Sequence, residues 1–377
     1  MRGDKMNTMQ NKSGKNLYYP GMFDFIKGIA MISIVMTHAQ FALGEEAFAT
    51  GSDWILKLFG VIGDATSFGN AAMPMFLLVS GYGFRKTKDN WKCVKKQAKL
   101  LLKPFAFAAC LTTVLHLCVH YAAFRYFPGS IRATIGVGLG YLLGASNTFY
   151  IGGITVCSVG AVWFLGMLFW GWIALNFIMN KVNEKHLPWL MALILVIGRL
   201  LCLLPPIPYC LVQGVIAIPY LYMGWMIKKH ELLTKKFSPV IWGIMIVGAI
   251  WSSKFGLLRI SDPYVRYGIL ELICDGFMAF LVMWIGLRIN RFQFPLKSCI
   301  GMIGRYSLWI MCLHTIEQQA LPWYLLYERL GMLDNWMLYL ISLALKTILI
   351  YIGYRFLIWN DQRKIKKKRE MRRHRHV

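Results

Sequence analysis

The chain has 377 residues, of which 57% are hydrophobic and 15% aromatic, and only 16% are charged. Lys and Arg outnumber Asp and Glu by 42 to 17, which gives a formal net charge of +25. A soluble globular domain has about 45 to 50% apolar and about one quarter charged residues, so the composition excludes that class and intrinsic disorder, and leaves an integral membrane protein or an unusually apolar nucleic-acid binder.

Ten segments are long and apolar enough to cross a membrane as helices, since a bilayer core of about 30 Å needs about twenty residues. In chain order they are 22–43, 60–84, 98–124, 161–180, 187–204, 208–228, 239–256, 265–289, 299–320 and 336–359. The weaker, Gly-rich segment 131–146 is expected to be interfacial or re-entrant. The connections are too short for a folded soluble domain, so the sequence predicts an all-α, polytopic transmembrane bundle of about ten helices.

The distribution of Lys and Arg predicts the orientation of these spans. Basic residues gather at the N-terminus, in the connections that follow even-numbered spans and at the C-terminal end. The opposite connections hold only Lys57, Arg125, Arg132, Arg259, Arg266 and Arg329. By the positive-inside rule we expect a multi-pass plasma-membrane protein with a polar cytoplasmic N-terminus (1–21), a transmembrane domain (22–360) and a basic cytoplasmic tail (361–377).

Several other classes of site are not favoured. The tail RKIKKKREMRRHRH directly follows a predicted span, so we interpret it as an anchor for anionic lipid headgroups and expect no nucleic-acid partner. The nine cysteines form no CxxC pair and no regular spacing, which argues against a disulfide framework and a zinc site. The first twenty residues contain no apolar core of a signal peptide, so none is expected.

Ionisable side chains inside the predicted spans are the first candidates for function, because each is costly at membrane depth. They are Lys27, His38, Asp64, His116, His120, Arg199, Glu271, Asp275, Arg305, His314, Glu317 and Lys346. His38 follows Lys27 by eleven residues, about 16 Å of helix rise and close to three turns, so the two side chains share one face of the first span.

His38, His314 and Glu271 are expected at similar depths in the first, ninth and eighth spans. If those spans are neighbours, two imidazoles and a carboxylate converge, an arrangement suited to proton transfer. Interhelical hydrogen bonds that lock the bundle are the alternative, and both readings stay open. His116 and His120 have the i, i+4 spacing of a metal site but lack a third ligand, so we interpret them as structural and predict no metal.

The connection between the second and third spans is strongly basic. It holds Arg85, Lys86, Lys88, Lys92, Lys95, Lys96, Lys99 and Lys103. The positive-inside rule alone would explain this run. Together with Lys27, the run would also form a cytoplasmic funnel for a polyanion. No P-loop or GxGxxG occurs, so a nucleotide-like ligand would be held by side chains.

Four motifs resemble the membrane-bound acyltransferase 3 family, in the family's order. FDFIKGIAMISIVMTHAQ (23–40) is similar to its opening helix, in which a basic residue and a His stand where Lys27 and His38 stand here. Lys in place of the commoner Arg resembles the branch of sugar O-acetylases of the fucose 4-O-acetylase type. The other matches are AAMPMFLLVSGYGFRK (71–86) through Phe76, Ser80, Gly81 and Tyr82, AVWFLGMLF (161–169) through Trp163 and Phe164, and RYSLWIMCLHT (305–315) through Ser307 and His314.

The sequence also departs from the family pattern. Arg85 and Lys86 replace a clean Arg-x-Arg, and no esterase-like domain follows the last span in this sequence, so stand-alone members are the better comparison. The resemblance implies transfer of an acyl group, usually acetyl from acetyl-CoA, to a hydroxyl of a surface glycan or a lipid-linked sugar. Acyl-CoA would be a co-substrate, and no permanently bound cofactor is expected.

The resemblance also assigns roles to residues. The CoA phosphates would be held by Lys27, Arg85, Lys86, Lys95, Lys99 and Lys103. His38 would act as general base, or as a nucleophile through an acyl-imidazole, while His314 or Glu271 would orient it or stabilise the oxyanion. An exporter or flippase of a glycan intermediate is the alternative, although no internal repeat is visible. The sequence indicates no oligomeric state.

Overall fold

The computed structural model describes residues 21–41, 54–66, 71–204, 207–256, 260–261 and 266–373, and these residues are almost entirely helical. The helices of the first half are α1 (Asp24–Phe41), α3 (Trp54–Thr66), α4 (Ala72–Tyr82), α5 (Asn90–Gln97), α6 (Lys103–Phe124), α7 (Phe127–Leu143) and α8 (Trp163–Lys181). Those of the second half are α9 (Leu187–Leu201), α10 (Leu211–Lys229), α11 (Pro239–Phe255), α12 (Ile269–Ile289), α13 (Lys297–Arg305), α14 (Ser307–Ala320), α15 (Trp323–Leu330) and α16 (Asn335–Arg373). The prediction of an all-α fold is confirmed.

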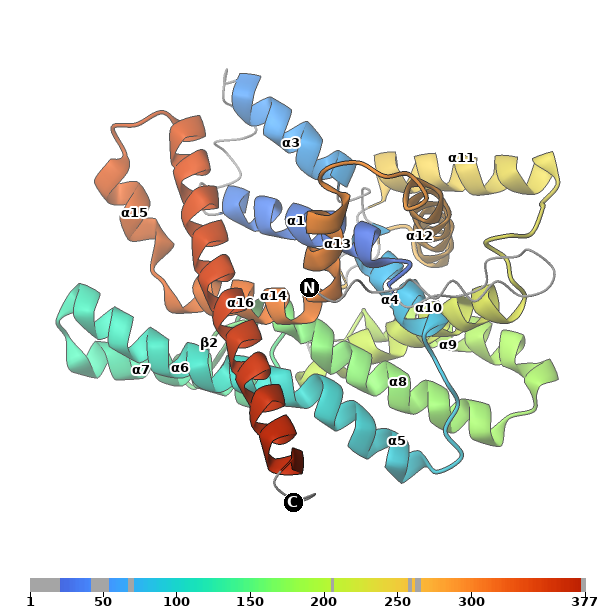
Figure 1. The fold of residues 1–377 in the computed structure, drawn as a ribbon, viewed down its shortest axis with the longest axis horizontal. Helices are drawn as coiled ribbons and strands as arrows, with labels where there is room; N and C mark the ends of the chain where they lie inside the picture. The colour runs from blue at the N-terminus through green and yellow to red at the C-terminus, as the bar shows by residue number, and fades with distance from the viewer. Residues whose placement is uncertain are drawn as a thin grey trace.

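One short antiparallel hairpin interrupts the helices. Strands β1 (Phe149–Ile151) and β2 (Ile154–Val156) pair with Phe149 opposite Val156. Gly152 and Gly153 form the turn, and both have positive φ, which glycine adopts without steric cost. The hairpin packs back onto α7, which itself lies along α6 (Figure 1). The weaker segment 131–146 falls mostly within α7 and is helical as far as Leu143.

Length and composition identify five helical stretches that are able to cross a membrane: Asn90–Phe124, Gly160–Lys181, Pro208–Lys229, Ile269–Ile289 and Asn335–Asn360. A sixth is obtained if α13 and α14, which meet at an angle of 76°, are counted as one broken span. The helices α4 and α11 are apolar but shorter. Every predicted span thus falls on a helix or a pair of helices, and five or six of them reach spanning length among the described residues.

Two predicted spans are not single straight helices. The segment 60–84 contains the end of α3 and all of α4, and these helices pack on different neighbours, α3 on α1 and α16 and α4 on α10 and α12. The residues between the two helices, 67–70, lie outside the described part of the chain. The segment 299–320 bends at Tyr306, between α13 and α14.

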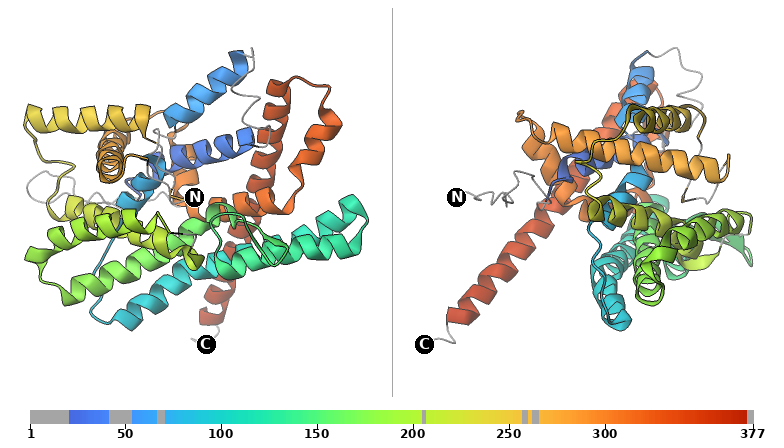
Figure 2. Two further views of the ribbon diagram at one scale, coloured as in Figure 1. Left: turned by 180° about the vertical axis from the view of Figure 1, so that it is seen from behind. Right: turned by 90° about the vertical axis from the view of Figure 1, so that its right-hand side faces the viewer.

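The first and the last described helices, α1 and α16, differ in how much of their length packs against other helices. The helix α1 packs on α13, α14 and α16, whereas α16 continues without a break from the body of the molecule to Arg373. Figure 2 shows the C-terminal part of α16 extending away from the other helices. The predicted tail from residue 361 to residue 373 is therefore a continuation of the last apolar helix.

Glycines allow two pairs of helices to meet backbone to backbone. A Cβ added to Gly81 on α4 would lie 2.0 Å from the Leu221 carbonyl oxygen on α10. A Cβ added to Gly304 on α13 would lie 1.7 Å from the Asp24 carbonyl oxygen on α1. Small residues permit such close approach in membrane proteins, where van der Waals packing drives helix association. These two contacts fix α4 and α1, the helices that carry two of the four family-like motifs.

We expect Gly81→Ala to lower the melting temperature of the purified protein in detergent, because the added methyl group overlaps a backbone carbonyl and costs about 1 to 3 kcal/mol or more. The matched control is Gly243→Ala on α11, where a Cβ would meet nothing within 4 Å. Equal melting temperatures for the two variants would show that the contact between α4 and α10 has room for the added methyl group.

Candidate active site

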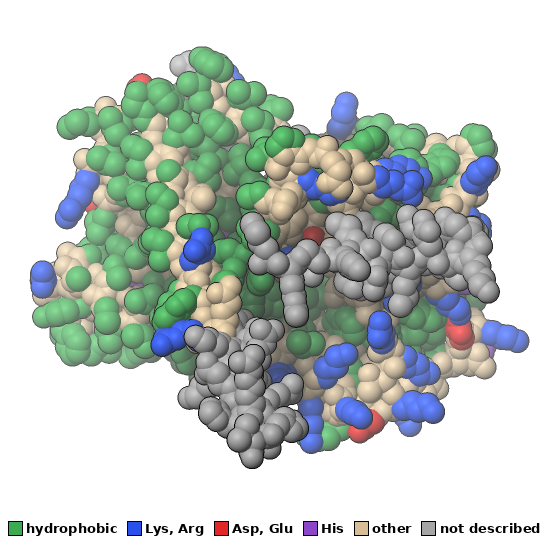
Figure 3. Space-filling model, viewed as in Figure 1, with side chains coloured by type: hydrophobic (Ala, Val, Ile, Leu, Met, Phe, Trp, Pro, Cys, Tyr) green, Lys and Arg blue, Asp and Glu red, His purple; other side chains and the backbone are tan. Residues whose placement is uncertain are grey.

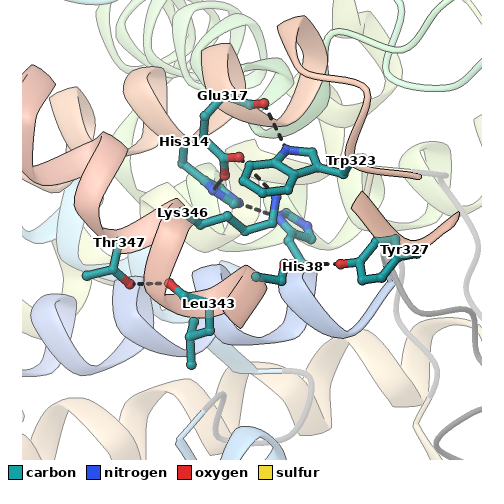
Figure 4. Close-up of polar contacts among 9 residues, drawn as sticks. His38, His314, Glu317, Trp323, Tyr327, Leu343, Lys346 and Thr347 are labelled. Carbon is teal, nitrogen blue, oxygen red and sulfur yellow. Dashed lines mark hydrogen bonds and ion pairs between the residues drawn. The ribbon is translucent and has the colours of Figure 1, made fainter. Parts of the chain in front are cut away.

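Four ionisable side chains from three helices form a continuous polar chain (Figure 4). His38 Nδ1 on α1 lies 2.6 Å from His314 Nε2 on α14. His314 Nδ1 lies 2.8 Å from Glu317 Oε1, and Glu317 Oε2 lies 2.9 Å from Lys346 Nζ on α16. The expectation that His38 and His314 meet across helices is thus matched by the geometry.

The polar chain is buried, which makes its internal pairing obligatory. His314 is 0% exposed, Glu317 5% and Lys346 1%. His314 and Glu317 are three residues apart on α14 and so lie on one helix face. Burying an ion without a partner costs several kcal/mol, so Glu317 and Lys346 stabilise each other's charge.

A tryptophan from α15 completes the surroundings of the ion pair. The Lys346 ammonium lies 3.9 Å above the centroid of the Trp323 ring, a cation–π contact. The Trp323 indole N–H donates to the Glu317 backbone carbonyl at 3.0 Å. Nearby, the Tyr327 hydroxyl on α15 lies 3.1 Å from Ser342 Oγ on α16. The short helix α15 is in this way fastened over the buried end of the polar chain.

The hydrogen bonds determine which nitrogen of each imidazole carries the proton. A carboxylate only accepts, so His314 Nδ1 donates to Glu317 and His314 Nε2 is left as an acceptor. His38 Nδ1 must then donate to His314 Nε2, which leaves the lone pair of a neutral His38 ring on Nε2. This is the tautomer that a general base requires, and it is imposed from Glu317 through His314.

The polar chain opens onto a cavity of about 550 Å³. A cavity of this size is typical of sites for small ligands. The polar and aromatic residues that line it are His38, His116, His120, Gln318, Gln319, Trp323, Tyr324 and Lys346. His38 is half-buried, so its ring connects the buried chain to the cavity.

Lys27 lies at the other end of α1, in a second charged cluster. Its ammonium is 2.7 Å from Asp24 Oδ1, and Arg305 Nε on α13 is 3.5 Å from Asp24 Oδ2. Phe23 packs edge-on against Tyr82 of α4, with ring centroids 5.2 Å apart. This contact brings the end of α4, and with it the basic residues that start at Arg85, toward the end of α1 that carries Lys27.

The predicted basic loop is at the surface. The side chains of Arg85, Lys86, Lys95, Lys99 and Lys103 are all exposed. They lie on the connection after α4, on α5, on the π-helical turn Ala98–Leu102 and at the start of α6. Figure 3 shows Lys and Arg side chains gathered at the lower right of the molecule, over α5 and the ends of α8 and α10. Basic charge is therefore available on this side for an anionic partner.

The structure places Glu271 in a different polar group from the one expected. The buried Glu271 carboxylate, in the first turn of α12, accepts a hydrogen bond from the Tyr267 amide at 2.9 Å. One turn further, Asp275 is hydrogen-bonded by Ser252 of α11. The carboxylate that contacts His314 is Glu317. Glu317 stood among the charges expected at membrane depth, and its i, i+3 spacing from His314 is the sequence pattern that would have selected it.

The remaining family-like motif residues make packing contacts. Ser80 Oγ accepts a hydrogen bond from the Trp172 indole at 2.8 Å. Trp163 and Phe164 are buried and in edge-on contact, and Phe164 also packs on Phe76. Ser307 is half-buried and begins α14 just after the bend. The contacts of Ser80 and Phe164 join α4 to α8.

His116 and His120 contact hydroxyl groups of the neighbouring helix. Each uses its Nδ1, His116 toward Thr134 Oγ1 at 2.8 Å and His120 toward Ser130 Oγ at 3.0 Å, both on α7. Within the described residues, no group of three or more His, Cys, Asp or Glu side chains is arranged to hold a metal ion. Both contacts join α6 to α7, which is the kind of contact that the structural interpretation of the pair expects.

In a comparison with known protein families, residues 22–355 match the acyltransferase 3 family, whose description is 'acyltransferase domain'. The chain belongs to this family. The match runs from the residues before α1 into α16, so it includes every element of the candidate site. Its apolar helices and its family identify the acyltransferase as a multi-pass membrane protein. No curated protein and no solved structure matches the chain.

We expect Glu317→Gln and Lys346→Met each to destabilise the acyltransferase by about 3 to 5 kcal/mol, because each leaves one buried charge without its partner. The double variant removes both charges and is expected to regain most of the lost stability. Melting temperatures in detergent measure this coupling. Additive losses in the double variant would show that the two charges do not depend on each other.

Proposed function

We propose that the acyltransferase moves an acyl group, acetyl in the first instance, from cytoplasmic acyl-CoA to a hydroxyl of a cell-surface glycan or a lipid-linked sugar. The observation that carries this proposal is the chain from Lys346 through Glu317 and His314 to His38, which ends at a cavity of about 550 Å³. It supplies a base of defined tautomer beside a space large enough for a substrate. The family supplies the reaction class.

In the proposed reaction His38 acts as general base. Its Nε2 accepts the proton of the acceptor hydroxyl as that oxygen attacks the thioester carbonyl carbon. The C–S bond then breaks, and the CoA thiolate takes the proton from the His38 imidazolium to leave as a thiol. His314 and Glu317 support the transient positive charge on His38, and Lys346, which lines the cavity, is placed to stabilise the oxyanion.

The donor would approach from the opposite end of α1. Lys27 and Arg305 share Asp24 there, and Arg85 and the exposed lysines of α5 add positive charge. Basic side chains of this kind bind phosphate strongly. The rise of about 16 Å from Lys27 to His38 is comparable to the length of a pantetheine arm, so the phosphates and the thioester would reach the two sites together. The proposal includes cytoplasmic termini and about ten crossings, with the shorter helices α4, α9 and α11 among them.

Release of thiol distinguishes this function from export of a glycan intermediate. The purified acyltransferase in detergent is expected to consume acetyl-CoA when a sugar acceptor is present, whereas an exporter would not. Mass spectrometry of surface glycans from cells with and without the protein would identify the acceptor through the mass of the missing acyl group. Transport of a glycan without consumption of acyl-CoA would establish the exporter instead.

We expect His38→Ala to lower the rate of acetyl transfer by at least about a hundredfold, because general-base catalysis contributes about 10² to 10⁴ in rate. The measurement is sugar-dependent thiol release by the purified variant. The control is His230→Ala, which changes an exposed histidine at the end of α10. Full activity of His38→Ala would rule out the mechanism.

We expect Lys27→Ala to raise the KM for acetyl-CoA about tenfold with little change in kcat, because it removes a charge-assisted contact to a phosphate and leaves the reacting groups in place. The effect should shrink as ionic strength rises. Lys57→Ala, an exposed lysine on α3, serves as the control. An unchanged KM with reduced kcat would place Lys27 outside the donor site.

A further inference from the structure

The cavity has a wall opposite the catalytic chain that the proposed reaction does not use. The wall is formed by α6, whose His116 and His120 lie one turn apart with ring centroids 5.3 Å apart. Both rings are half-buried, and each is held from behind by a hydroxyl of α7 through its Nδ1. Among the described residues neither Nε2 has a protein partner, so a purely structural role leaves the other edge of both rings unused.

The hydrogen bonds behind His120 determine what its free edge can bind. Ser130 Oγ donates its hydrogen to the Tyr126 carbonyl at 2.8 Å. The Ser130 oxygen must therefore accept from His120, so His120 Nδ1 carries the proton. In the neutral ring the lone pair is then on Nε2, as it is in His38. Two helices thus present imidazole acceptors to one cavity, both fixed from the rear.

The other polar side chains of the cavity bear on the kind of ligand. Apart from the histidines and the aromatic residues they are Gln318, Gln319 and Lys346, and Lys346 is paired with Glu317. His120 Nε2 is thus a hydrogen-bond acceptor on the cavity wall that the proposed reaction leaves unused. A hydroxyl group of a bound ligand is a donor that would satisfy it.

We infer that this wall is the acceptor subsite, in which His120 Nε2 accepts a hydrogen bond from one hydroxyl group of the sugar while His38 receives the hydroxyl to be acylated. The inference rests on the proposed function and narrows its acceptor to a sugar with at least one further free hydroxyl. Trp323 and Tyr324 border the same cavity and offer the aromatic surface against which sugar rings pack.

The test uses the purified full-length protein in detergent, acetyl-CoA, methyl glycosides of hexoses and their monodeoxy analogues. His120→Phe keeps a ring but removes the acceptor, and is expected to lower kcat/KM for the best glycoside about tenfold, mainly through KM. The KM for acetyl-CoA and the slow hydrolysis of acetyl-CoA by water should not change. His120→Gln returns an acceptor near the position of Nε2 and should recover most of the loss.

The matched control and the deoxy series separate recognition from folding. Cys118→Ala changes an exposed residue of the same helix, between the two histidines, and should behave as the wild type. In the wild type, removal of one hydroxyl other than the acylated one should cost about tenfold. The same removal should cost His120→Phe little, because the contact is already lost.

Other outcomes would overturn the inference. If His120→Phe changes the KM for acetyl-CoA instead, the wall holds the pantetheine arm of the donor. If transfer and hydrolysis fall equally, His120 only supports packing. Equal sensitivity of wild type and His120→Phe to every deoxy analogue would also refute the subsite. Absence of His38-dependent thiol release with all glycosides would overturn the proposed function and the subsite with it.

Discussion

The ion pair between Glu317 and Lys346 is the interaction on which the site depends. Both groups are almost fully buried, and each offsets the cost of burying the other's charge. The pair joins α14 to α16, and through Trp323 it also holds α15. Because Glu317 is fixed in this way, it fixes the proton of His314, and His314 fixes the proton of His38. The ion pair thereby sets the tautomer of the imidazole that faces the cavity.

The helix α1 carries His38 near one end and, near the other, Lys27 in its charged cluster with Asp24 and Arg305. Its contact with α13 is so close that a side chain at Gly304 would overlap the Asp24 carbonyl, and Asp24 in turn pairs with Lys27 and Arg305. The helix cannot slide along α13 without breaking this contact. The separation between Lys27 and His38 is set by the rise of α1 itself, and the contact with α13 holds this helix in place.

Much of this arrangement could be predicted from the sequence because helix periodicity and hydropathy are local properties. They placed a helix in every predicted span, and the resemblance to the acyltransferase 3 family is confirmed over residues 22–355. Depth along a helix also placed His38 and His314 at one level. Depth alone could not favour Glu317 over Glu271 as their partner. Depth was counted along one straight span, 299–320, whereas α14 begins only after the bend at Tyr306. That bend, like the break between α3 and α4, depends on which neighbours the helices meet.

The single imidazole at the end of the polar chain has an electrical consequence for the proposed cycle. In that cycle the proton that His38 takes from the acceptor would be returned at the same ring to the departing thiol. For each turnover an acyl group would go outward as a hydrogen goes inward, and neither carries a charge of its own. The proposed reaction would therefore move no net charge across the bilayer, and the membrane voltage would do no work on it. The thioester alone would drive the transfer.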